Sequence, residues 1–200
     1  MIELAQLPFS QACENNQRPI LDVLKPKLTD SLQLLEVGSG TGQHATFFAH
    51  QLPHLTWQAS DQHCNINHIN CRINHFKRSN LPSAIALDIS QTWPTQNYDA
   101  VFTANTLHIV NRQLVEAFFA GVAKITLTNA NLFIYGPFNY QKQYTSDSNA
   151  NFDIWLKQRD PQSGIRDIEW IVELANAQQF ELVEDVSMPA NNRLVHFIKR

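Results

Sequence analysis

Strand-like and helix-like segments alternate along most of this 200-residue chain. Such alternation is typical of a parallel sheet, because strands that run in the same direction are joined by helices that cover both faces. Strands are expected at residues 32–38, 55–61, 83–89, 98–105 and 130–138, and helices at residues 43–52, 63–76, 112–126 and 168–179. The chain is therefore expected to adopt a Rossmann-like, doubly wound α/β fold.

The two ends of the chain depart from this alternation. Strand patterns at residues 180–188 and 192–200 flank the short connection "PAN". This arrangement predicts a hairpin and therefore a mixed sheet with an antiparallel member. Near the start, residues 17–28 are expected to form a helix that Pro26 ends or bends.

Composition and charge limit the class of protein. A net charge of -3 and a pI near 6.2 supply no basic surface for a phosphate backbone, so a nucleic-acid partner is disfavoured. The start of the chain lacks a signal-peptide pattern, and no apolar run approaches the ~18 residues of a membrane span. The cysteines are odd in number and form no framework: Cys13, Cys64 and Cys71. We therefore expect reduced thiols and a soluble, cytoplasmic protein.

No linker, low-complexity tract or long repeat divides the sequence. One domain is therefore expected over residues 1–200, with an N-terminal helical segment at residues 1–31 covering the site. The sequence gives no indication of the oligomeric state.

A glycine-rich motif, "LLEVGSGTGQHA", follows the first expected strand. Glu36 leads its three glycines, which are Gly38, Gly40 and Gly42. A dinucleotide fingerprint requires a third glycine where this chain has Gln43, and a phosphate-binding P-loop requires a G-K-[ST] that is absent. A carboxylate at this edge of a sheet repels pyrophosphate but attracts an ammonium or sulfonium group. S-adenosylmethionine carries both cations and no phosphate, although glycines alone are also compatible with a plain strand–helix turn.

Two acidic residues close the next strands. Asp61 ends the second strand, about twenty residues beyond Gly38, where a carboxylate accepts hydrogen bonds from ribose hydroxyls. Asp88 ends the third, within reach of an adenine amino group. Asp61 is also compatible with a helix N-cap, and Asp88 with a turn. Glycine-rich or acidic ends on three strands at one sheet edge are more specific than any one of them.

With these motifs in place, the chain resembles class I S-adenosylmethionine-dependent methyltransferases over nearly its full length. The resemblance rests on "LLEVGSGTGQHA", "ASD", "ALDIS" and "YDAVFTANTLHIV". The chain is more similar still to a methyltransferase-like family of unknown substrate, in "ENNQRPIL", "YGPFNY", "SNANFDIWLKQRDP", "GIRD" and "MPANNRL". The resemblance implies a seven-stranded sheet whose last strand is antiparallel.

The same resemblance implies roles for individual residues. Glu36 and the three glycines would hold the methionine part of the cofactor, Asp61 the ribose, and Asp88 with Ile89 the adenine. Asn105 would lie near the reactive end. The chain departs from the family in having "TNAN" where Pro-Gly-Gly is usual, but asparagine tolerates left-handed backbone. It also has "ANTLHI" in place of the [N/D]-P-P-[Y/F] signature, which counts against methylation of nucleic-acid bases.

The acceptor side of the site is less specific in sequence. His108 follows the fourth strand and is the expected general base, since the ordinary pKa of histidine lies near neutrality; a structural histidine at a helix start is the alternative. The segment "YGPFNY" follows the fifth strand and is expected either to form an aromatic wall or to pack as an ordinary loop. Its candidate substrate-binding residues are Tyr135, Phe138, Asn139 and Tyr140. The polar-rich segments "SNANFDIW" and "MPANN" could close over the site.

A stripe of cysteine and histidine has a spacing similar to that of a zinc site: Cys64, His68, Cys71 and His75. On a helix, however, eleven residues span about 16 Å, whereas zinc holds its ligands at ~2.0–2.3 Å. The isoleucines occupy the opposite face and are expected to face the core: Ile66, Ile69 and Ile73. A solvated stripe is therefore expected, with no metal.

The expected function is methyl transfer from S-adenosylmethionine to a small-molecule acceptor. A protein of this fold that binds the cofactor without catalysis, as an interaction module, is the alternative. A nicotinamide oxidoreductase is a weaker alternative, which Glu36 and Gln43 oppose.

Overall fold

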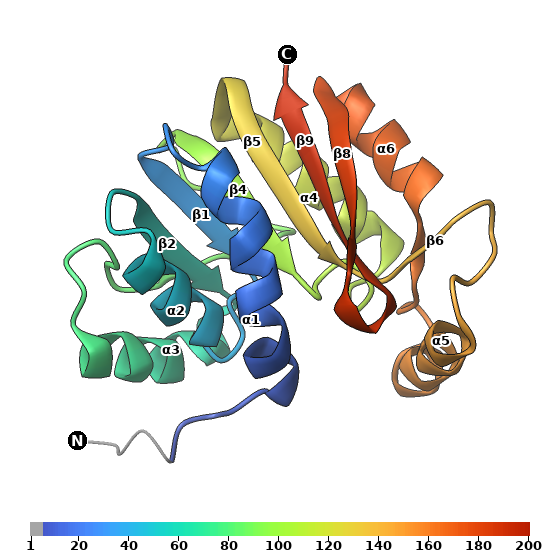
Figure 1. The fold of residues 1–200 in the computed structure, drawn as a ribbon, viewed down its shortest axis with the longest axis horizontal. Helices are drawn as coiled ribbons and strands as arrows, with labels where there is room; N and C mark the ends of the chain where they lie inside the picture. The colour runs from blue at the N-terminus through green and yellow to red at the C-terminus, as the bar shows by residue number, and fades with distance from the viewer. Residues whose placement is uncertain (1–5) are drawn as a thin grey trace.

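The computed structural model of the chain describes residues 6–200, so residues 1–5 of the expected N-terminal segment lie outside the described part. Seven strands form one sheet in the order β3-β2-β1-β4-β5-β9-β8 (Figure 1). Its strands are β1 (Gln33–Val37), β2 (Thr56–Asp61), β3 (Ile85–Ala86), β4 (Tyr98–Ala104), β5 (Thr126–Gly136), β8 (Phe180–Met188) and β9 (Asn192–Lys199). Only β9 pairs antiparallel with its neighbours, β5 and β8. The expected mixed seven-stranded sheet with an antiparallel last strand is confirmed.

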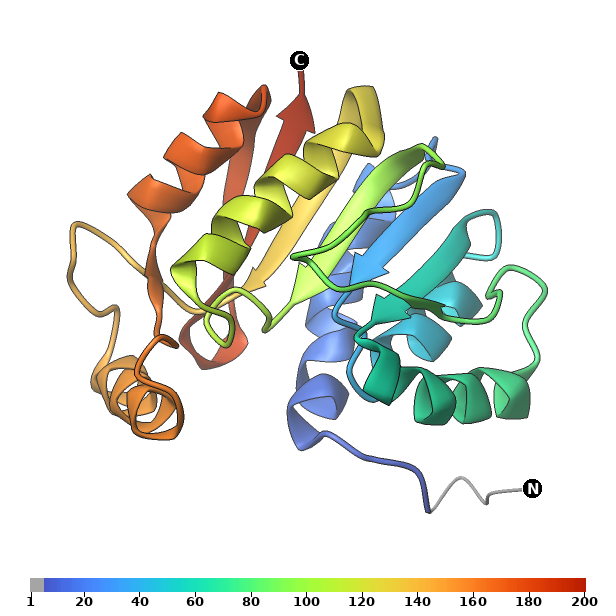
Figure 2. The same cartoon turned by 180° about the vertical axis from the view of Figure 1, so that it is seen from behind.

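Helices cover both faces of this sheet, as expected. They are α1 (Gln11–Leu24), α2 (Gln43–Gln51), α3 (His63–Phe76), α4 (Arg112–Lys124), α5 (Asp147–Arg159) and α6 (Ile168–Ala177). Helices α1 and α2 pack on one face of the sheet, and α4 and α6 pack on the other (Figures 1 and 2). Apolar side chains on alternate strand positions supply a separate core to each face, because successive residues of a strand point to opposite sides. Because β1, β2, β4 and β5 run parallel, their carboxyl ends share one edge of the sheet, and α5 lies beyond that edge.

The N-terminal helix begins earlier than its sequence pattern predicts. Ser10 is the N-cap of α1 and its hydroxyl accepts a hydrogen bond from the Cys13 N–H at 3.3 Å. The helix ends at Leu24, and Pro26 lies in the short 3-10 helix η2 (Lys25–Lys27) that follows. Pro26 therefore marks the end of the α-helix, as predicted.

Two further elements differ from the sequence prediction. The segment "SNANFDIW" belongs to α5, a full helix capped by the Ser146 hydroxyl, which accepts from the Asn149 N–H at 3.1 Å. The sequence did not predict this helix, because asparagine and serine favour turns and caps over helix interiors. The segment "TNAN" lies inside β5, where Asn129 has a φ of +70°. The expected tolerance of asparagine for left-handed backbone is therefore used within a strand.

The stripe of cysteine and histidine lies on α3. Ile69 and Ile73 are buried beneath it and Cys64 is exposed, as the helical spacing predicts. His68 is more than a solvated side chain, because its Nε2 lies 2.9 Å from the Gly40 carbonyl oxygen. Among residues 6–200, no helix is long and apolar enough to cross a membrane.

Candidate active site

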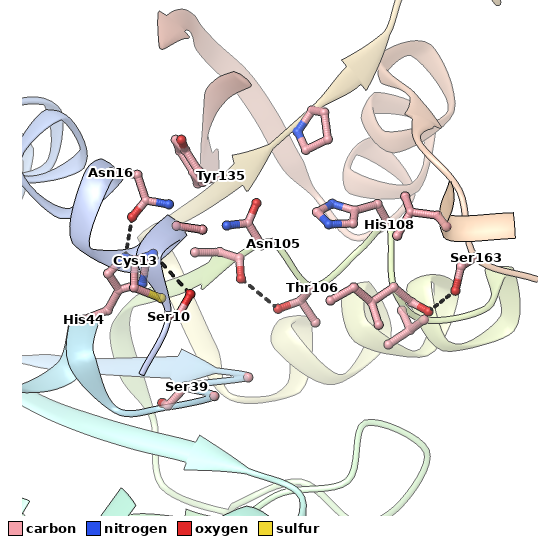
Figure 3. A pocket seen from close by; sticks show the side chains of 18 of the residues that line it. Ser10, Cys13, Asn16, Ser39, His44, Asn105, Thr106, His108, Tyr135 and Ser163 are labelled. Carbon is pink, nitrogen blue, oxygen red and sulfur yellow. Dashed lines mark hydrogen bonds between the residues drawn. The ribbon is translucent and has the colours of Figure 1, made fainter. Parts of the chain in front are cut away.

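A cavity of about 1170 Å³ lies at the carboxyl edge of the sheet, walled by strand ends, the first turns of α1, and α5. In Figure 3, residues of α1 lie on one side of this space and His108 and Ser163 on the other, with Asn105 and Tyr135 between them. The predicted site residues that line it are Gly38, Gly40, Asp61, Asp88, Ile89, Asn105, His108 and Tyr135. Those outside its lining are Glu36, Gly42, Phe138, Asn139 and Tyr140.

The glycine loop takes a conformation that side chains oppose. Gly38 and Gly40 have φ of +76° and +55°, in the left-handed region. A Cβ on Gly38 would lie 2.8 Å from the Thr106 hydroxyl oxygen, whereas a Cβ on Gly40 would meet nothing within 4 Å. The first glycine therefore permits close packing against the loop after β4, and the second leaves backbone open to the cavity.

Asp61 braces this loop from the end of β2. Its Oδ2 accepts a hydrogen bond from the Gly40 N–H at 2.6 Å, and its Oδ1 accepts from the Gln62 N–H at 2.7 Å and from Asn65 Nδ2 at 2.8 Å. The N-cap of α3 is Gln62, which contributes no side-chain cap. A carboxylate has about four lone-pair sites, so one acceptor position remains on Oδ2.

Asp88 forms a turn and lines the cavity at once. Its Oδ1 accepts hydrogen bonds from the Ser90 N–H at 2.9 Å and the Ser90 hydroxyl at 2.7 Å, and these bonds lower the pKa of the carboxyl. Its Oδ2 has only a 3.4 Å contact with Gln91 Nε2. The two sequence interpretations of Asp88 are therefore compatible.

Glu36 lies behind the cavity wall. It is 1% exposed, and its Oε2 accepts a hydrogen bond from Trp57 Nε1 at 2.9 Å. Burial raises the pKa of Glu36 to about 7. Its neighbour His44 is also buried, which lowers the pKa of that imidazole to about 4, and His44 Nε2 lies 2.7 Å from Asn16 Oδ1 on α1. Glu36 thus belongs to a buried polar cluster that ties α1 to the sheet.

Gln43 connects the glycine loop to α1 in a second way. Its Oε1 accepts hydrogen bonds from the Ser10 N–H at 2.6 Å and from the Thr41 hydroxyl at 2.9 Å. These bonds hold the first turn of α1 over the start of α2, at the position where a dinucleotide fingerprint has its third glycine. Ser10, Cys13 and Asn16 thereby line the cavity.

His108 is a buried, uncharged member of the other wall. Its side chain is 5% exposed; burial and, to a lesser extent, the Arg166 charge lower the pKa of the imidazole to about 4. Within residues 6–200 its ring makes no hydrogen bond and meets the Phe152 ring edge-on, with centroids 5.4 Å apart. The predicted pKa near neutrality is therefore wrong for His108: its ring is a weaker base than a free imidazole. The ring is neutral at physiological pH and has both nitrogens available to a bound molecule.

Tyr135 presents a hydroxyl between the two walls. Burial raises the pKa of this phenol, and the nearby side chains of Asn16 and Asn192 partly offset that increase. Asn16 Oδ1 lies 2.7 Å from His44 Nε2, so the amide nitrogen is the end of Asn16 that is left for other partners. The hydroxyl proton of Tyr135 is then available to a bound molecule.

After Tyr135, Pro137 is the one residue of "YGPFNY" that also lines the cavity. Phe138 is buried in the core with α4 and α6, and Asn139 is buried with its Oδ1 unpaired among the described residues. The Tyr140 hydroxyl donates to Asp185 Oδ2 at 2.6 Å. The aromatic wall comes from α5, where Phe152 and Trp155 stack with centroids 5.7 Å apart, and sequence reasoning missed it together with the helix. Their i, i+3 spacing was the available signal.

Comparison with known proteins identifies a family to which the chain belongs. The model of the family described as "Protein of unknown function (DUF938)" matches residues 7–199. The chain belongs to that family.

Solved structures share its fold at low sequence identity. An O-methyltransferase family protein from Burkholderia thailandensis is 13% identical with a TM-score of 0.82, over 94% of this chain and 57% of the other. A putative O-methyltransferase from Nostoc punctiforme is 14% identical with a TM-score of 0.81, over 94% and 56%. Human N-acetylserotonin methyltransferase, solved in complex with SAM, is 12% identical with a TM-score of 0.80, over 94% and 53%. The chain spans a little over half the length of each protein, and the likeness confirms the class I methyltransferase fold.

Proposed function

We propose that the protein transfers a methyl group from S-adenosylmethionine to a small-molecule acceptor. The observation that carries this proposal is the single cavity that joins Gly40, Asp61 and Asp88 to His108 and Tyr135. A cofactor held by the first group would present its reactive end to the second group within the same cavity. The fold neighbours support the proposal, since one of them was solved with this cofactor.

The cavity residues divide the cofactor among them. The glycine loop at Gly38 and Gly40, open at Gly40, would receive the methionine part, and the remaining acceptor position on Asp61 would receive a ribose hydroxyl. Asp88 and Ile89 would hold the adenine, and Asn105 would lie by the reactive end. Glu36 would make no direct contact with the cofactor, because its carboxyl accepts a hydrogen bond from Trp57 and lies outside the cavity lining.

The electrostatics of this half favour a ligand without phosphate. Its carboxylates, Asp61 and Asp88, would repel pyrophosphate, and among the cavity-lining residues the only lysine or arginine is Arg159, on α5. Ser10, bonded to Gln43, also covers the start of α2 that a pyrophosphate would use. Asp61 and Asp88, which face the cavity, would therefore supply the preference for a cationic ligand that the sequence assigned to Glu36.

Residues of the chain would align the acceptor and take its proton. Bound S-adenosylmethionine supplies a methyl group on a sulfonium, which an acceptor atom receives by in-line displacement as the carbon–sulfur bond breaks. His108 is held neutral and can accept the proton that the acceptor loses, and Tyr135 can donate a hydrogen bond that orients it. Phe152 and Trp155 would cover the acceptor and limit the access of water.

Calorimetric titration with S-adenosylmethionine and with NAD tests the cofactor assignment. We expect S-adenosylmethionine to bind at least tenfold more tightly. Equal or tighter binding of NAD would overturn the proposal. If S-adenosylmethionine binds, a screen of small-molecule acceptors then separates catalysis from the alternative of a binding module that transfers no methyl.

A further inference from the structure

The loop after β4 that carries His108 is held by a distant segment, residues 163–166. Arg166 Nε donates to the Leu107 carbonyl at 3.1 Å, and its Nη2 donates to the Val110 carbonyl at 2.5 Å. One guanidinium therefore fixes both ends of the four-residue loop. Arg166 is 8% exposed, and the planar fork of arginine suits two acceptors in fixed positions.

The same segment binds the two carbonyls in between. The Gly164 N–H donates to the His108 carbonyl at 2.9 Å, and the Ser163 hydroxyl donates to the Ile109 carbonyl at 2.5 Å. Every carbonyl of residues 107–110 thus accepts a hydrogen bond from residues 163–166. These hydrogen bonds hold the backbone of the loop in one conformation, since each bond restrains a different peptide unit.

This clamp is itself anchored on α5. Asp153, 1% exposed, accepts from the Ile165 N–H at 2.7 Å and from the Tyr144 hydroxyl at 2.7 Å. A Cβ on Gly164, whose φ is +156°, would lie 2.9 Å from Asp153 Oδ1, so only glycine fits there. The loop, the clamp and α5 therefore form one connected wall, which argues against α5 as a moving lid.

The clamp also brings a buried positive charge beside His108. Arg166 donates its bonds to carbonyls, including that of Gln162 at 3.0 Å, and makes no ion pair within residues 6–200. Among the described charged groups, Arg166 is the one whose charge lowers the pKa of His108. A cation in this place opposes protonation of the imidazole, in the same direction as burial.

We propose that Arg166 is a positioning residue, which fixes the His108 ring against the cavity through the carbonyls of Leu107 and Val110. This inference rests on the proposed function, because it presupposes that His108 faces a methyl acceptor. Arg166 itself is absent from the lining of the cavity and acts only through the loop. The geometry therefore assigns a role to an arginine that the sequence marked only as part of the shared segment "GIRD".

Nuclear magnetic resonance of the histidine-labelled protein tests the proposal without a substrate. Two readouts are followed: ring-to-ring contacts between His108 and Phe152, and the titration of the His108 imidazole. Arg166→Gln should remove the contacts and raise the pKa of His108 by about one unit, since a nearby cation is lost. Arg166→Lys keeps the charge and should largely restore the titration.

Arg112→Gln is the matched control, because Arg112 lies exposed at the start of α4 and stacks on Trp170 at 3.8 Å. This variant should leave both His108 readouts at their wild-type values, and His44 should titrate as in wild type in every variant. Retention of the His108–Phe152 contacts in a folded Arg166→Gln protein would overturn the proposal.

Two further arms keep the test decisive. Should Arg166→Gln fail to fold, Arg166→Lys replaces the planar guanidinium fork with a single ammonium that cannot hold both carbonyls in the same way, and unchanged His108–Phe152 contacts in that variant would count against the proposal. Affinity for S-adenosylmethionine is measured in parallel. Absent binding in wild type with the His108 effects intact would defeat the proposed function and leave the positioning of the ring standing.

Discussion

The two halves of the cavity are built in different ways. We call the side proposed to bind S-adenosylmethionine the cofactor half and the side proposed to bind the methyl acceptor the acceptor half. The cofactor half uses backbone and short acidic side chains at the ends of β1, β2 and β3, which are neighbours in the sheet. The acceptor half uses the loop after β4, Tyr135, and residues of α5 and 163–166 that lie some distance along the chain. The first half follows from strand order alone, whereas the second depends on packing between segments remote in sequence.

Their chemistry differs as well. The cofactor half presents carboxylates, and the acceptor half presents neutral polar groups and aromatic rings, with Arg159 and Asp160 among its lining. A chamber with few charges favours an uncharged reacting group, because a charge without a partner is costly to bury. Changes in each half should therefore affect different steps, and the following variants test that separation.

Loss of the proposed base should produce the largest effect, and only on chemistry. His108→Ala is expected to lower turnover by about 10²–10⁴-fold, because a positioned proton acceptor contributes about that much. Affinity for S-adenosylmethionine, measured by calorimetry, should stay within threefold of wild type. Wild-type turnover on an identified acceptor would return His108 to a structural role.

Loss of Asp61 should act on the cofactor half alone. A hydrogen bond to a charged group contributes roughly 1.5–3 kcal/mol, so Asp61→Ala should weaken cofactor binding by about 10- to 150-fold. Asp61→Asn should be nearly as harmful, since both oxygens accept from N–H groups and an amide would place a donor against Gly40 or Gln62. Calorimetry on both variants, with a thermal melt of each, checks this.

Wild-type affinity in Asp61→Asn with a lower melting temperature in Asp61→Ala would limit this residue to a structural role. The comparison between halves would then lose its clearest cofactor contact.

Buried neutral histidines make the stability of the fold dependent on pH. His44 and His108 lie in the two halves of the cavity, and His196 lies on β9, outside the cavity. Burial holds the pKa of His44, His108 and His196 near 4, below the ordinary 6.5, so the stability they contribute is present above pH 6.5 and is lost as the pH falls toward 4. Glu36, with its pKa raised to about 7, opposes this between pH 4.5 and 7. Three histidines outweigh one glutamate, so the free energy of unfolding should rise by about 2 kcal/mol per unit from pH 5 to pH 6.

Denaturant unfolding at pH 5, 5.5 and 6 measures this slope. A flat or falling stability over the interval would show that these histidines are not held neutral.

The smallest effect is expected at Glu36. Glu36→Gln keeps an oxygen for Trp57 Nε1 and is isosteric, so cofactor affinity should change by less than threefold by calorimetry. A loss of tenfold or more would show that this carboxyl acts on the cofactor and that the cavity wall opens to it. Gly40→Leu is the matched comparison on the cavity side, and it should weaken binding far more, since its side chain would enter the open space.

The sequence predicted well which strand ends meet at one edge of the sheet, because the order and direction of those strands are set by local patterns. Gly38, Gly40, Asp61 and Asp88 each come directly after such a strand, and the structure brings them to one cavity. Glu36 precedes the loop by two residues, and strand alternation turns its side chain into the core instead.

The acceptor half was predicted less well, because nothing local marks it. Phe138 and Tyr140 follow β5 as Tyr135 does, yet their side chains pack elsewhere, and the aromatic wall is supplied by Phe152 and Trp155. Arg166 lies in the segment "GIRD", but that segment did not indicate its role, which arises from contacts with a loop more than fifty residues away. Long-range packing of this kind cannot be predicted from periodicity.

A crystal structure with S-adenosylhomocysteine, the demethylated form of the cofactor, tests the central claim most directly. We predict the adenine beside Asp88 and Ile89, a ribose hydroxyl on Asp61 Oδ2, the amino-acid part over Gly38 and Gly40, and the sulfur facing the chamber of His108 and Tyr135. A ligand bound in the acceptor half, or with its ribose away from Asp61, would contradict the account.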